Sequence, residues 1–272
     1  MHFVVCVKQV PDTTEVRVDP VTKTLVREGV PSIINPYDAH AVEEAVRLKE
    51  RYGGKVTAIS MGPPQAEEVL RRALAIGADR AILLTDRTFA GSDTLATSYI
   101  LAQAIRRLDR EEPVTLVLCG KQAIDGDTGQ VGPGIATRLG FTPLTYVLAV
   151  EEIDIEAGEI KVQRKLEDAR QVVCGKLPAL LTVVKEINEL RYAALPDLVR
   201  AARTRPERWT AADLEVDPGR TGLKGSPTSV RRIFAPPQRP GGEMIPGGTE
   251  DPARAASLLV DKLLKTKLIA DL

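Results

Sequence analysis

The stretch "GKQAIDGDTGQVGPG" at residues 120–134 has the residue types of a ligand-binding loop. It follows an apolar run and holds five glycines, one lysine and two aspartates. Glycine has no Cβ, so it lets a backbone turn tightly and come close to a ligand, as in phosphate-binding loops. Neither common phosphate motif fits, however. A P-loop has its lysine directly after the second glycine, whereas Lys121 follows the first, and G-x-G-x-x-G occurs here only in reverse.

The charges of this loop indicate which anion it can hold. We expect a helix to begin after it, with Thr128 or Asp127 as the N-cap, and the free N–H groups of a first helical turn form an anion site. Lys121 is the only cation in the loop. Asp125 and Asp127 oppose negative charge. This balance favours a nucleotide monophosphate or a diphosphate bridge over a triphosphate with Mg²⁺.

Three further stretches are predicted at the same edge of the fold. Cys6–Lys8 and Ser60–Gly62 each follow a strand-like run, and Asn35–Asp38 opens a helix. In doubly wound sheets, ligands bind beyond the carboxyl ends of the strands, where the winding direction reverses. These stretches therefore predict a ring of binding residues. The alternative is that they are ordinary turns whose glycines serve geometry only.

Side chains that could catalyse a reaction by themselves are scarce. The chain has two histidines, His2 and His40, so neither a Ser-His relay nor a histidine metal site is expected. We interpret the adjacent carboxylates Glu43-Glu44 and Glu167-Asp168 as solvated charge, and His40 as a helix-surface residue. The chain is thus predicted not to be an enzyme by its own side chains, although a cofactor can supply chemistry that they lack.

The elements that position these residues alternate along the chain. Apolar runs predict strands, and amphipathic stretches between them predict helices, of which the first has Asn35 as N-cap, Pro36 at its first position and Gly53 just past its end. This order predicts an α/β fold with a doubly wound, mostly parallel sheet. The predicted strands are residues 3–10, 55–62, 80–86 and 114–120, and the predicted helices are residues 35–54, 63–78 and 93–109.

Outside this alternation, the pattern changes in three places. Residues 15–29 interrupt the first crossover with an alternating pattern that predicts a small hairpin, and residues 146–184 predict antiparallel strands at the sheet edge. Beyond residue 190 there are nine prolines up to Pro252, which predict an extended C-terminal arm without a core of its own. Only residues 252–269 regain helical periodicity. Such an arm needs a surface to lie on, and a partner subunit is the natural candidate.

Composition excludes several classes of protein. The 272 residues carry 37 basic and 37 acidic side chains, which argues against general nucleic-acid binding. No run approaches the ~20 apolar residues of a membrane span, and no basic region precedes the first apolar run, so we expect no membrane insertion and a cytoplasmic location. The three cysteines form no C-x-x-C pair, which favours reduced thiols.

Five ordered segments together resemble the β subunit of electron transfer flavoproteins, and the resemblance covers nearly the whole chain. It implies a heterodimer with a larger α subunit that holds most of a shared FAD. It also implies electron relay from acyl-CoA and other flavoprotein dehydrogenases, through that FAD, to a quinone oxidoreductase, and hence a role in fatty acid oxidation. The segments are "NPYDAHAVEEAVRLKE", "ALAIGADRAILL", "GKQAIDGDTGQVGP", "VQRKLEDARQVVCGKLPALLTV" and "LRYAALPDLVRAARTRP".

The resemblance also assigns roles to residues. It implies a pocket for AMP in this chain, and a docking role for Leu195, whose side chain would enter a hydrophobic pocket of a dehydrogenase. The implied organisation is a nucleotide-binding domain at 1–189, a dehydrogenase recognition loop at 190–205 and an arm at 206–272 that packs on the α subunit. The implied nucleotide contacts are Cys6, Asn35, Pro36, Tyr37, Asp38, Met61, Gly120, Lys121, Gln122, Ala123, Ile124, Asp125, Gly126, Asp127, Thr128, Gly129, Gln130 and Val131.

Other interpretations stay open at this point. Family members that bifurcate electrons place a second FAD in this pocket; "DGDTGQVGP" is closer to that branch, while "GKQAID" is closer to the AMP-binding one. Thr13 stands where some relatives have an aromatic residue near the flavin, so contacts from residues 9–14 to FAD are not assigned. Two other classes are a stand-alone nucleotide-binding regulator similar to universal stress proteins, which share this sheet, and an adenylate-transferring enzyme. The long arm argues against the first, and the lack of an S-G-G-x-D-S loop against the second.

Overall fold

The computed structural model describes residues 1–12, 31–231, 241–245 and 247–266. The chain divides into two compact units, residues 1–233 and residues 234–272. The hairpin predicted at residues 15–29 and Thr13 both lie outside the described residues. No helix in the described part of the chain combines the length and the apolar character that crossing a membrane requires.

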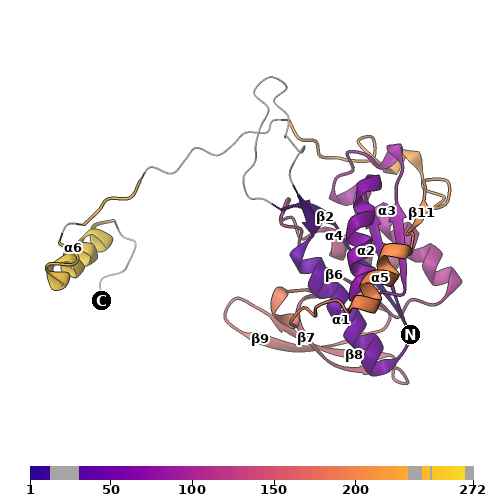
Figure 1. Cartoon of the computed structure of the whole chain (residues 1–272), viewed down its shortest axis with the longest axis horizontal. Helices are drawn as coiled ribbons and strands as arrows, with labels where there is room; N and C mark the ends of the chain where they lie inside the picture. The colour runs from indigo at the N-terminus through magenta and orange to yellow at the C-terminus, as the bar shows by residue number, and fades with distance from the viewer. Residues whose placement is uncertain (13–30, 232–240, 246, 267–272) are drawn as a thin grey trace. The chain divides into compact units, whose positions relative to one another are not determined.

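The first unit is built on a mixed sheet, which confirms the predicted fold class (Figure 1). Seven neighbouring strands are parallel, and two antiparallel strands extend the sheet beyond β7. In the described residues, the strands across the sheet are β11 (Glu207–Trp209), β5 (Arg80–Leu84), β4 (Lys55–Met61), β1 (His2–Cys6), β6 (Leu116–Gly120), β10 (Ala179–Val183), β7 (Thr142–Asp154), β8 (Glu159–Lys165) and β9 (Arg170–Lys176).

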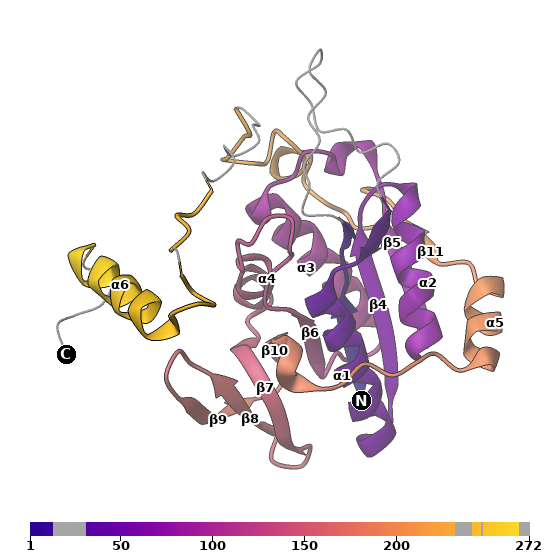
Figure 2. The same ribbon diagram turned by 60° about the vertical axis from the view of Figure 1, so that its left-hand side comes forward.

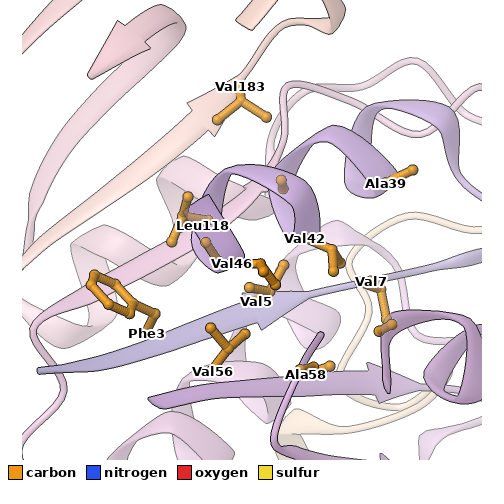
Figure 3. Close-up of a cluster of buried hydrophobic side chains, with 14 of the residues drawn as sticks. Phe3, Val5, Val7, Ala39, Val42, Val46, Val56, Ala58, Leu118 and Val183 are labelled. Atoms are coloured by element: carbon orange, nitrogen blue, oxygen red, sulfur yellow. The ribbon is translucent and has the colours of Figure 1, made fainter. Parts of the chain in front are cut away.

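Helices cover both faces of this sheet, and successive strand residues point to opposite faces. Val5 packs with Val42 and Val46 of α1 (Pro36–Tyr52), as Figure 3 shows, and residues of α2 (Glu67–Ile76) belong to the same apolar cluster. Val4 packs with α3 (Thr94–Glu111) and α4 (Val131–Leu139) in the other. The central strands are therefore buried on both sides, which explains why they read as continuous apolar runs.

The run predicted as one strand at residues 3–10 is divided in the structure. β1 ends at Cys6, and β2 (Gln9–Pro11) then pairs antiparallel with β3 (Ser32–Ile34) in a separate two-stranded sheet. Periodicity alone did not separate the two strands because Val7 and Val10 are both buried apolar residues. The division brings the chain at Lys8 beside Asn35, whose backbone N–H donates to the Lys8 carbonyl at 2.8 Å.

The expected arm does not begin at residue 206. β11 pairs with β5 at the sheet edge, and the indole of Trp209 is 4% exposed, with the guanidinium of Arg107 4.2 Å from its ring centre. Leu214 is buried in the same cluster. Residues 207–231 therefore belong to the α/β unit. Their many prolines and glycines hid this short apolar segment from the sequence analysis.

The segment predicted as a recognition loop is partly helical. α5 (Leu195–Arg203) lies beside α2 (Figure 2). The Arg71 guanidinium on α2 donates to the carbonyls of Ala201 and Thr204 near the end of α5. Arg200 donates to the carbonyl of Leu74 on α2 at 3.0 Å, so its charge is used within the chain. Leu195 opens the helix, and its side chain is 73% exposed.

Candidate functional site

The predicted binding residues meet at the carboxyl ends of three neighbouring strands. Cys6 ends β1, Met61 ends β4 and Gly120 ends β6, and β1 lies between the other two in the sheet. The chain leaves β1 towards β4 on one side, while β6 lies on the other, so this is the point where the winding reverses. The structure therefore brings the predicted ring of residues together at the place where ligands bind in such sheets.

Asp38 joins two of these strand ends. Its carboxylate accepts a hydrogen bond from the backbone N–H of Lys8 at 2.8 Å and from that of Gly120 at 2.9 Å. The side chain is 6% exposed, and burial raises its pKa to about 7, although the two backbone donors oppose that shift. Asp38 thus holds the ends of β1 and β6 at a fixed spacing, and its charge state changes near neutral pH.

Asn35 holds the loop that follows β6. It precedes α1 at the predicted N-cap position, but its side chain makes no capping hydrogen bond. Instead its amide nitrogen donates to the Gln122 carbonyl at 2.9 Å, and its amide oxygen accepts from the N–H of Ile124 at 3.2 Å. Asn35 is fully buried. The prediction of a capping side chain was wrong in that respect, because the loop competes for the same amide.

The two aspartates of the loop are engaged by other side chains. The Lys8 ammonium group contacts Asp125 at 2.7 Å, and the Gln122 amide donates to Asp127 at 2.7 Å. Asp127 has a φ of +52°, and neither it nor Thr128 caps the next helix. The N-cap of α4 is Gln130, without a side-chain cap, so the prediction of Asp127 or Thr128 as N-cap was wrong. The loop needs one more turn before the helix can start.

That extra turn leaves a row of hydrogen-bond donors. Within the described part of the chain, the backbone N–H groups of Thr128, Gly129 and Gln130 donate no hydrogen bond to another protein group. Gly129 has a φ of +62°, in the left-handed region that favours glycine. Successive N–H groups around such a residue, just before an uncapped helix, form a concave anion site. The geometry therefore suits a phosphate group.

The remaining predicted residues surround this loop. Tyr37, next to Pro36 in the first turn of α1, has the ammonium group of Lys121 5.4 Å from its ring centre. The Cys6 thiol is buried, and burial raises its pKa, so it stays protonated and is not a nucleophile. Ala123, Gly126 and Val131 complete the loop up to the first residue of α4.

Sequence reasoning missed some contacts. Thr94, at the start of α3, donates from its hydroxyl to the side-chain oxygen of Gln130 at 2.8 Å. The only sequence feature that indicated the position of Thr94 was Asp93, the N-cap residue directly before it. Glu43 and Glu44 were interpreted as solvated, which is wrong: both are buried, and they bond Arg191 and Asn188 respectively. These pairs fix the segment after β10 to α1.

Comparison with known proteins agrees with this fold. The model of the electron transfer flavoprotein domain matches residues 22–214. The chain belongs to the electron transfer flavoprotein family. It is 49% identical over 263 residues to the electron transfer flavoprotein subunit beta of Clostridium acetobutylicum, covering 97% of this chain and 98% of the relative. It is 51% identical over 276 residues to Protein FixA of Bradyrhizobium diazoefficiens, covering 100% of this chain and 95% of the relative.

A similar match is found with the electron transfer flavoprotein subunit beta of Thermoanaerobacterium thermosaccharolyticum. The two are 51% identical over 264 residues, which cover 97% of this chain and 98% of the relative. The chain is therefore a member of the β-subunit and FixA branch of this electron-carrier family of flavoproteins. The resemblance expected from the five sequence segments is confirmed.

Replacing Gly120 by alanine should disturb the site, whereas the same change at Gly126 should not. A Cβ on Gly120 would lie 2.4 Å from the Tyr37 Cβ and 2.6 Å from an Asp38 oxygen, while one on Gly126 meets nothing within 4 Å. We expect Gly120→Ala to cost about 1–3 kcal/mol of unfolding free energy and to weaken nucleotide binding at least tenfold. Urea unfolding and calorimetric titration with AMP measure the two effects. Equal behaviour of the two variants would contradict the close packing at Gly120.

Asp38 should give stability a pH dependence. Because its folded pKa of about 7 lies above its ordinary value of 3.8, the folded state holds this proton more tightly than the unfolded state. Its stabilising contribution is therefore complete below about pH 4 and is lost as the pH rises to about 7, by at most about 1.4 kcal/mol per unit. As the pH rises from about 4 to about 7, the unfolding free energy of the wild type should fall relative to that of Asp38→Asn. Above about pH 7 the difference between the two should stay constant.

Urea unfolding at five pH values between 4 and 8 measures this difference. Asp168→Asn, a change at an exposed carboxylate, is the matched control and should follow the wild-type curve. A constant difference between Asp38→Asn and the wild type would show that Asp38 does not titrate in this range.

Proposed function

We propose that this chain is the β half of a heterodimer, whose α subunit holds most of a redox-active FAD. Support comes from the matches over nearly the full length to two proteins named electron transfer flavoprotein subunit beta. A second support is α6 (Pro252–Lys265) of the C-terminal unit, where Leu258, Leu259 and Val260 are each more than a third exposed. Apolar side chains exposed around a helix in this way gain stability when a partner covers them.

The observation that carries the nucleotide proposal is the row of unpaired N–H groups at Thr128–Gln130. We propose that they bind the phosphate of AMP, with Lys121 as the nearest loop cation. Asp125 and Asp127 already have partners in Lys8 and Gln122, which reduces their repulsion of a monophosphate. The second candidate is a second FAD in the same pocket, as in electron-bifurcating members of the family, and the sequence "DGDTGQVGP" favours it.

In this proposal the chain's own side chains transfer no electrons. FAD accepts and releases them, and the chain positions nucleotides, subunit and dehydrogenase. Electrons would come from acyl-CoA and other flavoprotein dehydrogenases and pass to a quinone oxidoreductase. The charged and apolar side chains around Leu195 on α5 suit brief docking, because a single exposed leucine contributes only about 1–3 kcal/mol.

Co-expression with the α subunit encoded by the same organism tests the heterodimer and its nucleotides. We expect one FAD and one AMP per heterodimer, identified by chromatography after denaturation, and two FAD if the second candidate holds. A chain ending at residue 240 should fail to co-purify with the α subunit and keep its folded α/β unit, because residues 241–272 lie outside that unit. Full co-purification of the truncated chain, or a heterodimer without nucleotide, would contradict the proposal.

Leu195→Ala should slow electron transfer from a dehydrogenase by about tenfold or more below saturation. The side chain is 73% exposed, so its removal should leave stability, flavin spectrum and subunit association unchanged. Ile155→Ala, at a 52% exposed isoleucine after β7, is the matched control. Stopped-flow reduction of the heterodimer measures the rate. Wild-type rates in the Leu195 variant would show that residues 190–205 only connect neighbouring parts of the chain and do not dock a dehydrogenase.

A further inference from the structure

Three arginines on the face of the sheet that α3 and α4 cover are used neither by the nucleotide loop nor by α5. Arg106 is on α3, Arg138 is in the last turn of α4, and Arg220 ends the short helix η4 (Pro218–Arg220). α3 and α4 pack against one another. We call these three residues the arginine cluster.

Contacts with neutral groups hold the side chains of the arginine cluster in place. The Arg106 guanidinium donates to the backbone carbonyl of Arg138. The Arg138 guanidinium donates in turn to the carbonyl of Leu95 at 3.0 Å. The guanidinium carbon of Arg220 lies 4.0 Å from the ring centre of Tyr99, one helical turn after Leu95 on α3. Two carbonyls and an aromatic ring therefore fix the three positive charges along α3 and the end of α4.

These neutral contacts do not balance the charge of the cluster. Within the described part of the chain, none of the three arginines forms an ion pair with a carboxylate, whereas Arg107 on the same helix pairs with Asp213. The Nε of Arg138 is buried and has no hydrogen-bond partner among the described residues. Burial and the charges of Arg220 and Arg106 lower the pKa of Arg138. The cluster therefore carries positive charge that the described chain does not neutralise, which favours an acidic partner.

Exposed apolar side chains lie beside the arginine cluster. Leu95 is 49% exposed, and Leu223, three residues after Arg220, is 71% exposed. Leu223 packs on Gly91, where a Cβ would lie 2.6 Å from the leucine side chain. Arginine and aromatic side chains next to apolar ones are typical of protein interfaces. This surface therefore suits a protein partner more than a free anion.

The chain leaves the α/β unit at the same place. The Asp93 carboxylate, two residues before Leu95, accepts hydrogen bonds from the N–H and the hydroxyl of Thr228 at 3.1 and 2.9 Å. The Ser226 hydroxyl accepts from the Asp93 N–H at 2.8 Å. The chain up to Thr228 is therefore fixed to the start of α3, next to Leu95. A partner that binds the residues after this point can contact the arginine cluster as well.

We propose that the arginine cluster binds aspartate and glutamate side chains of the α subunit, with Leu95 and Leu223 as apolar contacts beside it. The inference rests on the proposed heterodimer and extends its interface from the C-terminal unit to the α3–α4 face of the α/β unit. Carboxylates of the α subunit accept hydrogen bonds from Arg138 and Arg220. Their negative charge offsets the repulsion within the cluster.

Sedimentation of the purified heterodimer at successive dilutions, at low and at high NaCl concentration, tests this inference. At low salt we expect Arg220→Gln to raise the dissociation constant about tenfold, and Arg220→Lys to raise it less because lysine keeps the charge. At high salt the difference from the wild type should shrink, since salt screens exposed charges. Arg110→Gln, at an arginine of α3 whose side chain is 66% exposed, is the matched control and should behave like the wild type.

The outcomes separate this inference from the proposed heterodimer. If Arg220→Gln associates like the wild type while the chain ending at residue 240 does not associate, the heterodimer stands and the cluster proposal is overturned. An equal loss of association in Arg110→Gln would also overturn it. Unchanged association of Arg220→Gln with slower reduction by a dehydrogenase would assign the cluster to that dehydrogenase and not to the α subunit. Thermal unfolding of the Arg220 variants near the wild-type temperature confirms that they are folded.

Discussion

The close approach of the first turn of α1 to the ends of β1 and β6 is the constraint on which the site depends. Asp38 reaches both strand ends, and Gly120 has no side chain that would keep α1 away. Three residues before Asp38, Asn35 holds Gln122 and Ile124. A buried carboxylate is costly unless hydrogen bonds satisfy it, so the same contacts that build the site also make the burial of Asp38 possible.

The properties of the loop follow from this anchor. With residues 122–124 fixed by Asn35, the chain must turn through Asp127 and Gly129, both at positive φ, before α4 can begin at Val131. The turn leaves three N–H groups without acceptors in the described residues, and the partners of Asp125 and Asp127 reduce the negative charge beside them. Thr128 and Gln130 are exposed, so these donors are open to water or to an anion that takes its place.

The elements at the two edges of the sheet lie away from this loop. On one side β11 and α5 complete the α/β unit, and α5 presents Leu195 to solvent. On the other side, the antiparallel strands β8 and β9 extend the sheet beyond β7. The central parallel strands are covered on both faces, so the proposed ligand and docking surfaces lie at the strand ends and sheet edges.

Local sequence patterns determined the parallel core, the helices between its strands and the family, but not the end of β1, which they placed at residue 10 and not at Cys6. Buried strands are continuous apolar runs, and the residues that follow them must lie at one edge of the sheet. Only the tertiary structure decided which partner each polar group has: Asn35 bonds the loop and not its own helix, Glu43 and Glu44 are buried against Arg191 and Asn188, and Trp209 joins the core from a proline-rich segment. Hydrogen bonds between residues more than eighty positions apart leave no periodic signal in a single sequence. Sequence patterns therefore predicted where the site lies, and the contacts across the fold decided how it is held.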